Sequence, residues 1–168
     1  ELASCLVGSE MCIRDRYNGS TFTAPGAGAS RFILKGGFRL NGGTFHHNDG
    51  TLRMNSRYDG TGESALGAGI TIAGGPGPNK NFYNLTKGVN KNVTLYSDIE
   101  VENKLQVVGT GRIRANGYDI TVGGDWDMQN SINFVPSTGQ VIFNGSSAQT
   151  IDMPDNFSNL TIANTAGV

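Results

Sequence analysis

The chain has 168 residues, of which Gly, Asn, Thr and Ser make up about 40% and charged residues only 16%. Because these four residue types are poor in helix interiors, the composition excludes a coiled coil or a helix bundle. The formal net charge of −1 excludes a dedicated nucleic-acid-binding protein, which needs a basic excess. No apolar run approaches the roughly 18 residues of a transmembrane helix. We therefore expect neither a nucleic-acid partner nor membrane insertion.

Residues 1–16 differ from the rest of the chain. They contain both cysteines, Cys5 and Cys12, but not the basic start and long apolar stretch of a secretory signal. The stretch CLVGSEMCIRDR, which ends at Arg16, resembles translated sequencing-adapter DNA that recurs at the ends of unrelated environmental gene predictions. We expect residues 1–16 to be an artefactual or disordered leader. The alternatives are a natural disordered N-terminus, a disulfide or a metal pair, although two cysteines with no nearby histidine are a weak metal signal.

Without this leader the chain is neutral. Residues 17–168 contain 11 basic and 11 acidic residues and no cysteine. This part must therefore be held together by packing and backbone hydrogen bonds. Such a composition is compatible with an extracellular bacterial protein, although the absence of cysteine does not assign a compartment.

From residue 93 onward, apolar and polar residues alternate in short segments. Period-two alternation of this kind, rich in β-branched and aromatic residues, predicts half-buried β-strands. The segments are Val93–Leu95, Ile99–Val101, Leu105–Val107, Ile113–Ala115, Ile120–Val122, Trp126–Met128, Ile132–Phe134, Val141–Phe143 and Leu160–Ile162. With Ile151 added, they start about 7.4 residues apart, and Phe32, Phe38, Phe45 and Leu52 show the same spacing.

That spacing predicts the architecture. Three such strands take about 22 residues, the length of one coil in a solenoid repeat, whereas sandwich strands are longer and further apart. We predict an all-β fold, a right-handed parallel β-helix (β-solenoid), with a β-sandwich as the alternative. We expect Gly and Asn to supply left-handed or bridging conformations at the corners. The expected corners are Asn41–Gly43, Asn116–Gly117, Gly123–Gly124 and Asn144–Gly145.

An internal repeat supports an array of similar units. Residues 45–55 align without gaps with residues 134–144, at an offset of 89 positions, and residues 81–86 align with 156–161, at an offset of 75. The two copies extend over about 36–86 and 123–161. The difference of 14 positions predicts an insertion in the first copy, in a Gly/Pro-rich surface loop at 59–80.

The second copy carries a resemblance. The order GGDW (from Gly123), STGQVIFNG (from Ser137), AQTI (from Ala148) and NFSNLTIANTAGV (from Asn156) is similar to repeats of large secreted surface proteins of Bacteroidota-type bacteria. It resembles less specifically the β-helical stalks of filamentous adhesins. The resemblance covers about residues 36–168 and implies an extracellular, repetitive, parallel β-helical segment. We expect the chain to be a fragment cut at both ends, without its export signal or sorting tail.

Few residues stand out as candidates for chemistry. His46 and His47 are the only histidines; adjacent side chains of a strand face opposite sides, so we expect an exposed turn pair rather than a metal site. If Trp126 points inward with Met128, it belongs to the core; the alternative is an exposed platform for stacking a glycan. We expect no catalytic, cofactor-binding or metal site.

Charged residues raise an enzymatic alternative. Carboxylates and arginines on an outward face are also what β-helical polysaccharide-degrading enzymes use, and paired carboxylates carry glycoside hydrolysis. We expect solvated faces instead, because the register between coils is not fixed by sequence and no calcium-loop pattern occurs. The charged residues concerned are Glu100, Glu102, Arg112, Arg114, Asp119, Asp125 and Asp127.

The sequence as a whole favours a non-catalytic, adhesin-like structural segment of a secreted or cell-surface bacterial protein. Surface glycans or other cell-surface components are the expected partners. A carbohydrate-binding module, with Trp126 or tyrosines as platforms, and a remnant of a polysaccharide-degrading enzyme are the alternatives.

Overall fold

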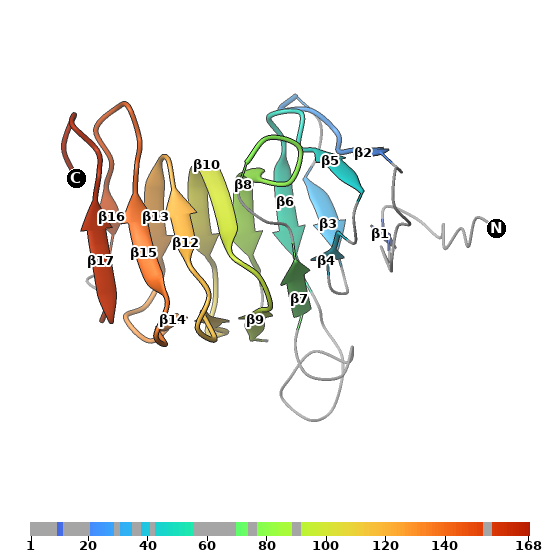
Figure 1. The fold of residues 1–168 in the computed structure, drawn as a ribbon. Helices are drawn as coiled ribbons and strands as arrows, with labels where there is room; N and C mark the ends of the chain where they lie inside the picture. Colours follow the sequence, from blue (N-terminus) through green and yellow to red (C-terminus); the bar gives the residue numbers. More distant parts are fainter. Residues whose placement is uncertain are drawn as a thin grey trace.

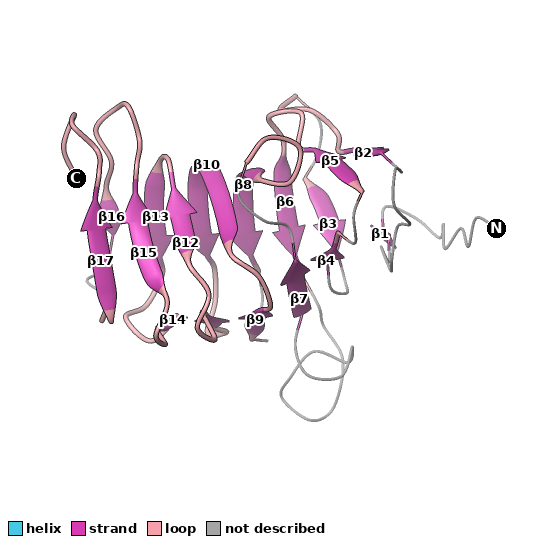
Figure 2. Cartoon of the chain, viewed as in Figure 1, coloured by secondary structure: helices cyan, strands magenta, loops and turns pink. Residues whose placement is uncertain are grey.

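A computed structural model describes residues 10–11, 21–28, 31–34, 38–40, 43–55, 70–73, 77–88, 92–152 and 156–168. Cys5, Cys12 and most of the leader lie outside these residues. The leader's Glu10–Met11 form β1, which pairs with β3 (Phe32–Leu34). The described residues contain strands, turns and irregular segments and no helix (Figure 2).

The strands form three faces that wind around one interior (Figure 1). Face A consists of β2 (Thr21–Thr23), β5 (Thr44–His46), the first part of β10 (Ile99–Val107), β12 (Ile120–Val122), β15 (Gln140–Phe143) and β17 (Asn159–Ile162). Between β5 and β10 this face continues through the hydrogen bond from Phe45 N–H to Asn79 C=O and the pairing of Phe82 with Val101.

The other two faces are built in the same way. Face B consists of β1, β3, β6 (Thr51–Met54), β8 (Phe82–Lys87), the last part of β10, β13 (Asp125–Met128) and β16 (Ile151–Asp152). Face C consists of β4 (Phe38–Arg39), β7 (Ile70–Ala73), β9 (Val93–Leu95), β11 (Ile113–Arg114) and β14 (Phe134–Val135).

Every described strand pair is parallel, and each strand pairs with strands one coil away. Ile99 pairs with Ile120, and Ile120 with Val141, so one coil takes 21 residues. The predicted parallel β-solenoid, with a coil of about 22 residues, is confirmed. A β-sandwich is excluded, because it consists of antiparallel sheets.

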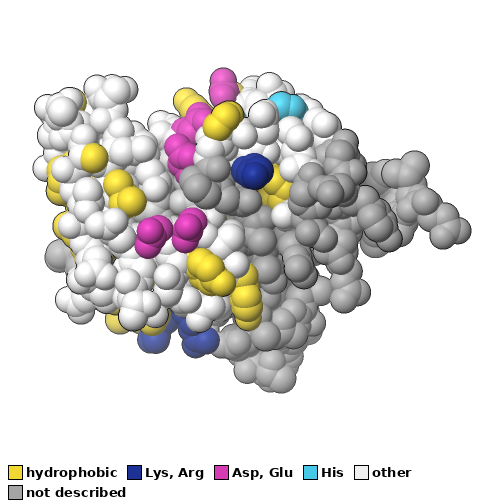
Figure 3. Space-filling model, in the orientation of Figure 1, with side chains coloured by type: hydrophobic (Ala, Val, Ile, Leu, Met, Phe, Trp, Pro, Cys, Tyr) yellow, Lys and Arg dark blue, Asp and Glu magenta, His cyan; other side chains and the backbone are white. Residues whose placement is uncertain are grey.

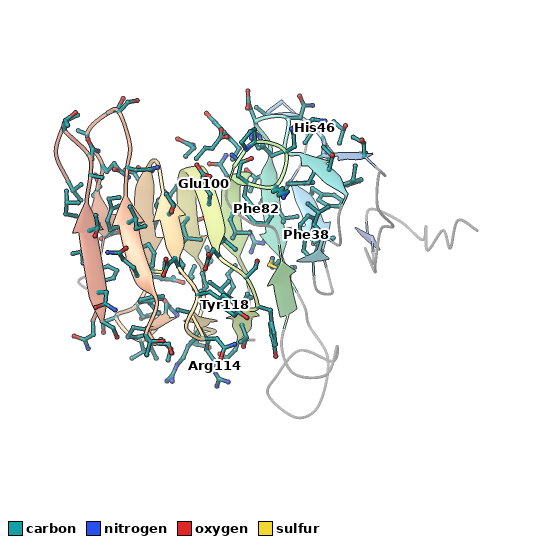
Figure 4. The ribbon with its side chains drawn as sticks, viewed as in Figure 1. Phe38, His46, Phe82, Glu100, Arg114 and Tyr118 are labelled. Atoms are coloured by element: carbon teal, nitrogen blue, oxygen red, sulfur yellow. The ribbon has the colours of Figure 1, made fainter. Side chains whose placement is uncertain are left out.

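Inward side chains form columns along the solenoid axis. On face A one column runs through Val101, Val122 and Phe143, which are buried. Two aromatic clusters, which include the buried Phe45 and Trp126, fill the interior. In Figure 4 the labelled Phe38 and Phe82 lie within the ribbon, in the same interior. The alternation seen in the sequence thus becomes a continuous apolar core.

The expected corners are of two kinds, and Asn41 and Gly42 lie outside the described residues. Asn116 and Gly117 have φ of 54° and 88°, so this corner has the predicted left-handed conformation. Gly123, Gly124 and Gly145 do not have a positive φ, and they are required because the coils approach closely there. A Cβ on Gly124 would lie 1.6 Å from the backbone oxygen of Asn103, one coil away.

The two copies of the repeat occupy different faces. β6 and β8 pair on face B, with Leu52 opposite Leu85, whereas their counterparts β15 and β17 pair on face A, with Val141 opposite Leu160. The repeated unit is therefore a strand–corner–strand pattern rather than a whole number of coils. Within the loop expected at 59–80, residues 70–73 form β7, because Ile-Thr-Ile-Ala alternates like a strand; 59–69 and 74–76 lie outside the described residues.

Candidate functional site

Polar side chains at the corners bind the backbone of the next coil. The carboxylate of Asp98 accepts a hydrogen bond from the N–H of Asp119 (2.9 Å), and the carboxylate of Asp119 accepts one from the N–H of Gln140 (2.7 Å). These residues are 21 positions apart, so the same contact recurs on successive coils. We call such hydrogen bonds between a side chain and the backbone of a neighbouring coil inter-coil clasps.

Asn133 makes a further inter-coil clasp from a fully buried position. Its amide donates to the carbonyls of Gly109 (3.0 Å) and Gly111 (2.8 Å), one coil earlier. The prediction that Ile132 begins an inward-facing strand here is wrong: Ile132 is 52% exposed and β14 begins at Phe134. Asn133 takes the inward place because its amide satisfies backbone groups that would otherwise be buried without partners.

A hollow of about 490 Å³ lies beside the histidines, at the end of β5. Its wall includes Glu102, whose carboxylate accepts a hydrogen bond from the amide of Asn81 and lies 3.3 Å from Nε2 of His47. Nδ1 of His47 accepts a hydrogen bond from the N–H of Asp49 (3.0 Å), and the ring stacks on Tyr83. The imidazole is therefore held in place on both sides.

The expected exposed histidine pair is only half correct. His46 is exposed and lies at the upper corner in Figure 4, but His47 is partly buried against Glu102. Within the described ranges no three His, Cys, Asp or Glu residues lie together in a way that could hold a metal ion. The left-handed backbone of Asn48 and Asp49 beside the hollow follows from turn chemistry, because Asn and Asp tolerate this conformation best after Gly.

A second hollow, of about 260 Å³, lies on the outer surface of face B. Its floor is formed by Asn84 and Thr86 of β8, with Thr51 and Arg53 of β6 on one side and Lys104 and Gln106 of β10 on the other. The residues that line it are Arg31, Thr51, Arg53, Asn84, Thr86, Lys104 and Gln106. We call this the face-B hollow. Three of its lining residues are basic and none is acidic or apolar.

One carboxylate lies just beyond the face-B hollow, on the next coil. Asp127 lies 2.6 Å from Nζ of Lys104 and accepts a hydrogen bond from the amide of Gln106 (2.8 Å). Partial burial on its own raises the pKa of Asp127, but these hydrogen bonds and the charge of Lys104 outweigh burial and hold the pKa below its ordinary value. Lys104 is therefore already paired, whereas no ion pair to Arg53 is found among the described residues.

Trp126 belongs to the core, as predicted for a side chain that points inward together with Met128. Its side chain is fully buried, and its ring contacts Phe134 edge-on with a centroid distance of 5.0 Å. It is therefore excluded as an exposed platform for a glycan. Tyr96 is 41% exposed and remains the most accessible described aromatic ring.

The charged residues singled out in the sequence lie at several separate places. Glu100 accepts a hydrogen bond from the N–H of Gly77 (2.8 Å), and Asp125 accepts one from the N–H of Thr150 (2.9 Å). In Figure 4 Arg114 lies in the lower part of the view and Glu100 in the upper part. On the side shown in Figure 3, acidic side chains gather at the top and centre and hydrophobic ones are scattered. Most of these carboxylates thus hold coils or turns together.

Lys87 is a buried lysine that the sequence pattern did not lead us to predict. It occupies an inward position of face B, between Met54 on one coil and Val107 on the next, and is 2% exposed. Burial lowers its pKa to about 8. The sequence signal was Asn-Leu-Thr-Lys, in which Lys87 falls two positions after Leu85 and therefore on the same side of the strand.

Comparisons with models of protein families, with curated proteins and with solved structures found no match to this chain. No helix in the described part of the chain has the length and apolar character needed to cross a membrane.

Proposed function

We propose that this chain is a structural, adhesin-like segment of a secreted or cell-surface bacterial protein, with a mechanical and non-catalytic role. The observation that carries the proposal is the series of inter-coil clasps. Asp98, Asp119 and Asn133 each fasten one coil to the next, in addition to the strand pairing. A segment built in this way resists separation of its coils along the axis.

The outer faces fit the same role. Some outward positions carry uncharged Thr and Asn side chains that lie beside one another along the axis, such as Thr21 beside Thr44 and Asn84 beside Thr51. Asn103 donates a hydrogen bond to Asn84 (2.7 Å) across one coil. A neutral, hydroxyl-rich and amide-rich surface over an apolar core suits an extended segment in water.

Single-molecule force spectroscopy on the whole chain tests the mechanical role. We expect stepwise extension, with about 70 Å of contour length released per coil of about 21 residues. Replacing Asn133 by Ala lowers the force at which its coil detaches, while the exposed Asn144→Ala leaves that force unchanged. Unfolding at a force too low to separate from the baseline, or an equal effect of both variants, would contradict the proposal.

A further inference from the structure

We propose that the face-B hollow binds a sugar unit that bears a carboxylate, within an acidic polysaccharide. The site would add a recognition function to the mechanical role and does not depend on it. Arg53 is the central residue: it projects outward from β6, partly buried, beside the floor of the hollow. Its guanidinium group is suited to a carboxylate because its N–H donors match the two oxygens in a fork.

The shape of the hollow follows from side-chain length. Arg53, Thr86 and Gln106 form one row across three neighbouring coils, and Thr51, Asn84 and Lys104 form a second row beside it. Neighbouring strands lie about 4.8 Å apart, so each row is about 10 Å long. In the first row the short Thr86 leaves a space between the longer Arg53 and Gln106, and in the second row Lys104 is the one long side chain. The hollow has a volume of about 260 Å³.

The hydrogen-bonding groups favour a hydroxyl-rich ligand. Oγ1 of Thr51 accepts a hydrogen bond from the amide of Asn84 (3.4 Å), so its own O–H is left to donate. The amide nitrogen of Gln106 donates to Asp127, so its carbonyl oxygen is left to accept. Sugar hydroxyl groups both donate and accept. The hollow thus offers partners for hydroxyls beside a cation for the carboxylate.

Charge along face B limits the site to one anionic unit. The outward row of Arg53, Thr86 and Gln106 continues on the C-terminal coils with Asp127 and Asp152, while Arg31 and Lys104 line the hollow beside that row. A carboxylate is attracted beside Arg53 and repelled beside Asp127 and Asp152. This polarity sets the place at which the anionic sugar binds.

The internal repeat shows that the fold itself does not require Arg53. In the second copy, Ile142 on β15 takes the place of Arg53, beside Thr161, the counterpart of Thr86. The same strand pair is therefore built without a cation. Gly88 is also adapted to the arginine: a Cβ there would lie 2.7 Å from Nε of Arg53.

Titrations monitored by NMR separate the parts of the proposed ligand. Methyl glucuronide carries the carboxylate and the hydroxyls, methyl glucoside only the hydroxyls, and acetate only the carboxylate. We expect methyl glucuronide to bind the whole chain with a Kd at least ten times lower than either of the other two. Equal Kd values for methyl glucuronide and acetate, or for methyl glucuronide and methyl glucoside, would overturn the proposal. Inorganic phosphate binding more tightly than methyl glucuronide would overturn it too, in favour of an adventitious anion only.

Three variants and one matched control locate the site. Arg53→Gln weakens binding about tenfold, whereas the matched Arg112→Gln, on an exposed arginine just before face C, leaves it unchanged. Gly88→Ala displaces the guanidinium without changing charge and also weakens binding. Asp127→Asn releases Lys104 and strengthens binding several-fold, which loss of structure cannot imitate. An unchanged Kd for Arg53→Gln, or weaker binding by Asp127→Asn, would place the ligand elsewhere.

Discussion

Replacing Lys87 by Met is expected to remove a pH dependence from the stability of the protein. Lys87 stands in an inward column of face B that runs Leu34, Met54, Lys87, Val107, Met128. Methionine already occupies this column at Met54, one coil away, and at Met128, two coils away. Its unbranched side chain has a length close to that of lysine. The substitution therefore removes a buried charge without opening a large cavity.

The size of the effect follows from the pKa. Burial lowers the pKa of Lys87 from 10.5 to about 8, and at about 1.4 kcal/mol per pKa unit this costs the folded state about 3 kcal/mol at neutral pH. Below pH 8 both states are protonated and the cost is fully present. Between pH 8 and 10.5 the unfolded chain stays protonated while the folded chain does not, so stability rises with pH. Above that range the cost has disappeared.

Denaturant unfolding at pH 7, 8, 9 and 10 measures this dependence. We expect the free energy of unfolding of the unsubstituted chain to rise by about 2–3 kcal/mol between pH 7 and pH 10 relative to that of Lys87→Met. The control is Lys80→Met, on an exposed lysine, with an expected change within about 0.5 kcal/mol at each pH. Parallel pH profiles for the unsubstituted chain and Lys87→Met would refute the reasoning.

Three further substitutions test the core, the corners and the inter-coil clasps by the same unfolding assay. Trp126→Ala, in the middle of an aromatic cluster, is expected to cost about 3–5 kcal/mol, against less than about 0.5 kcal/mol for the exposed Ile132→Ala. Gly124→Ala forces apart two coils and destabilises strongly, whereas Gly28→Ala meets no atom within 4 Å and is tolerated; similar effects of the two would contradict the close-approach argument. Asn133→Ala leaves buried carbonyls without donors and is expected to cost about 1–3 kcal/mol; no loss of stability would show that water replaces the amide.

The strands could be predicted because their signal is local. In a strand, successive side chains face opposite sides, so an apolar residue such as Val122 that follows a polar one is expected to face the core. The spacing of the strands along the sequence gives the coil length directly. Trp126 and Met128 were placed correctly by the same rule. Ile132 was not, because a buried amide that binds three backbone groups outweighs the hydrophobicity of one isoleucine at a corner.

The candidate sites could not be predicted because they depend on register between coils. Arg53 and Lys104 are 51 positions apart in the sequence, and one intervening coil takes 33 residues instead of about 21. Nothing in the local sequence around either residue shows that they line one hollow. The contact between His47 and Glu102 depends on the same longer coil.

Stability and recognition use different positions in this fold. The inter-coil clasps of Asp98, Asp119 and Asn133 lie at corners, where the backbone turns and its polar groups need side-chain partners. Arg53 and Thr86 lie in the middle of strands, where the backbone is already satisfied by parallel pairing and an outward side chain is free to vary. A solenoid can therefore acquire a binding hollow on a face without weakening the corners. The two repeat copies illustrate this: Arg53 in the first copy is replaced by Ile142 in the second, while the strand pairing at that position is kept.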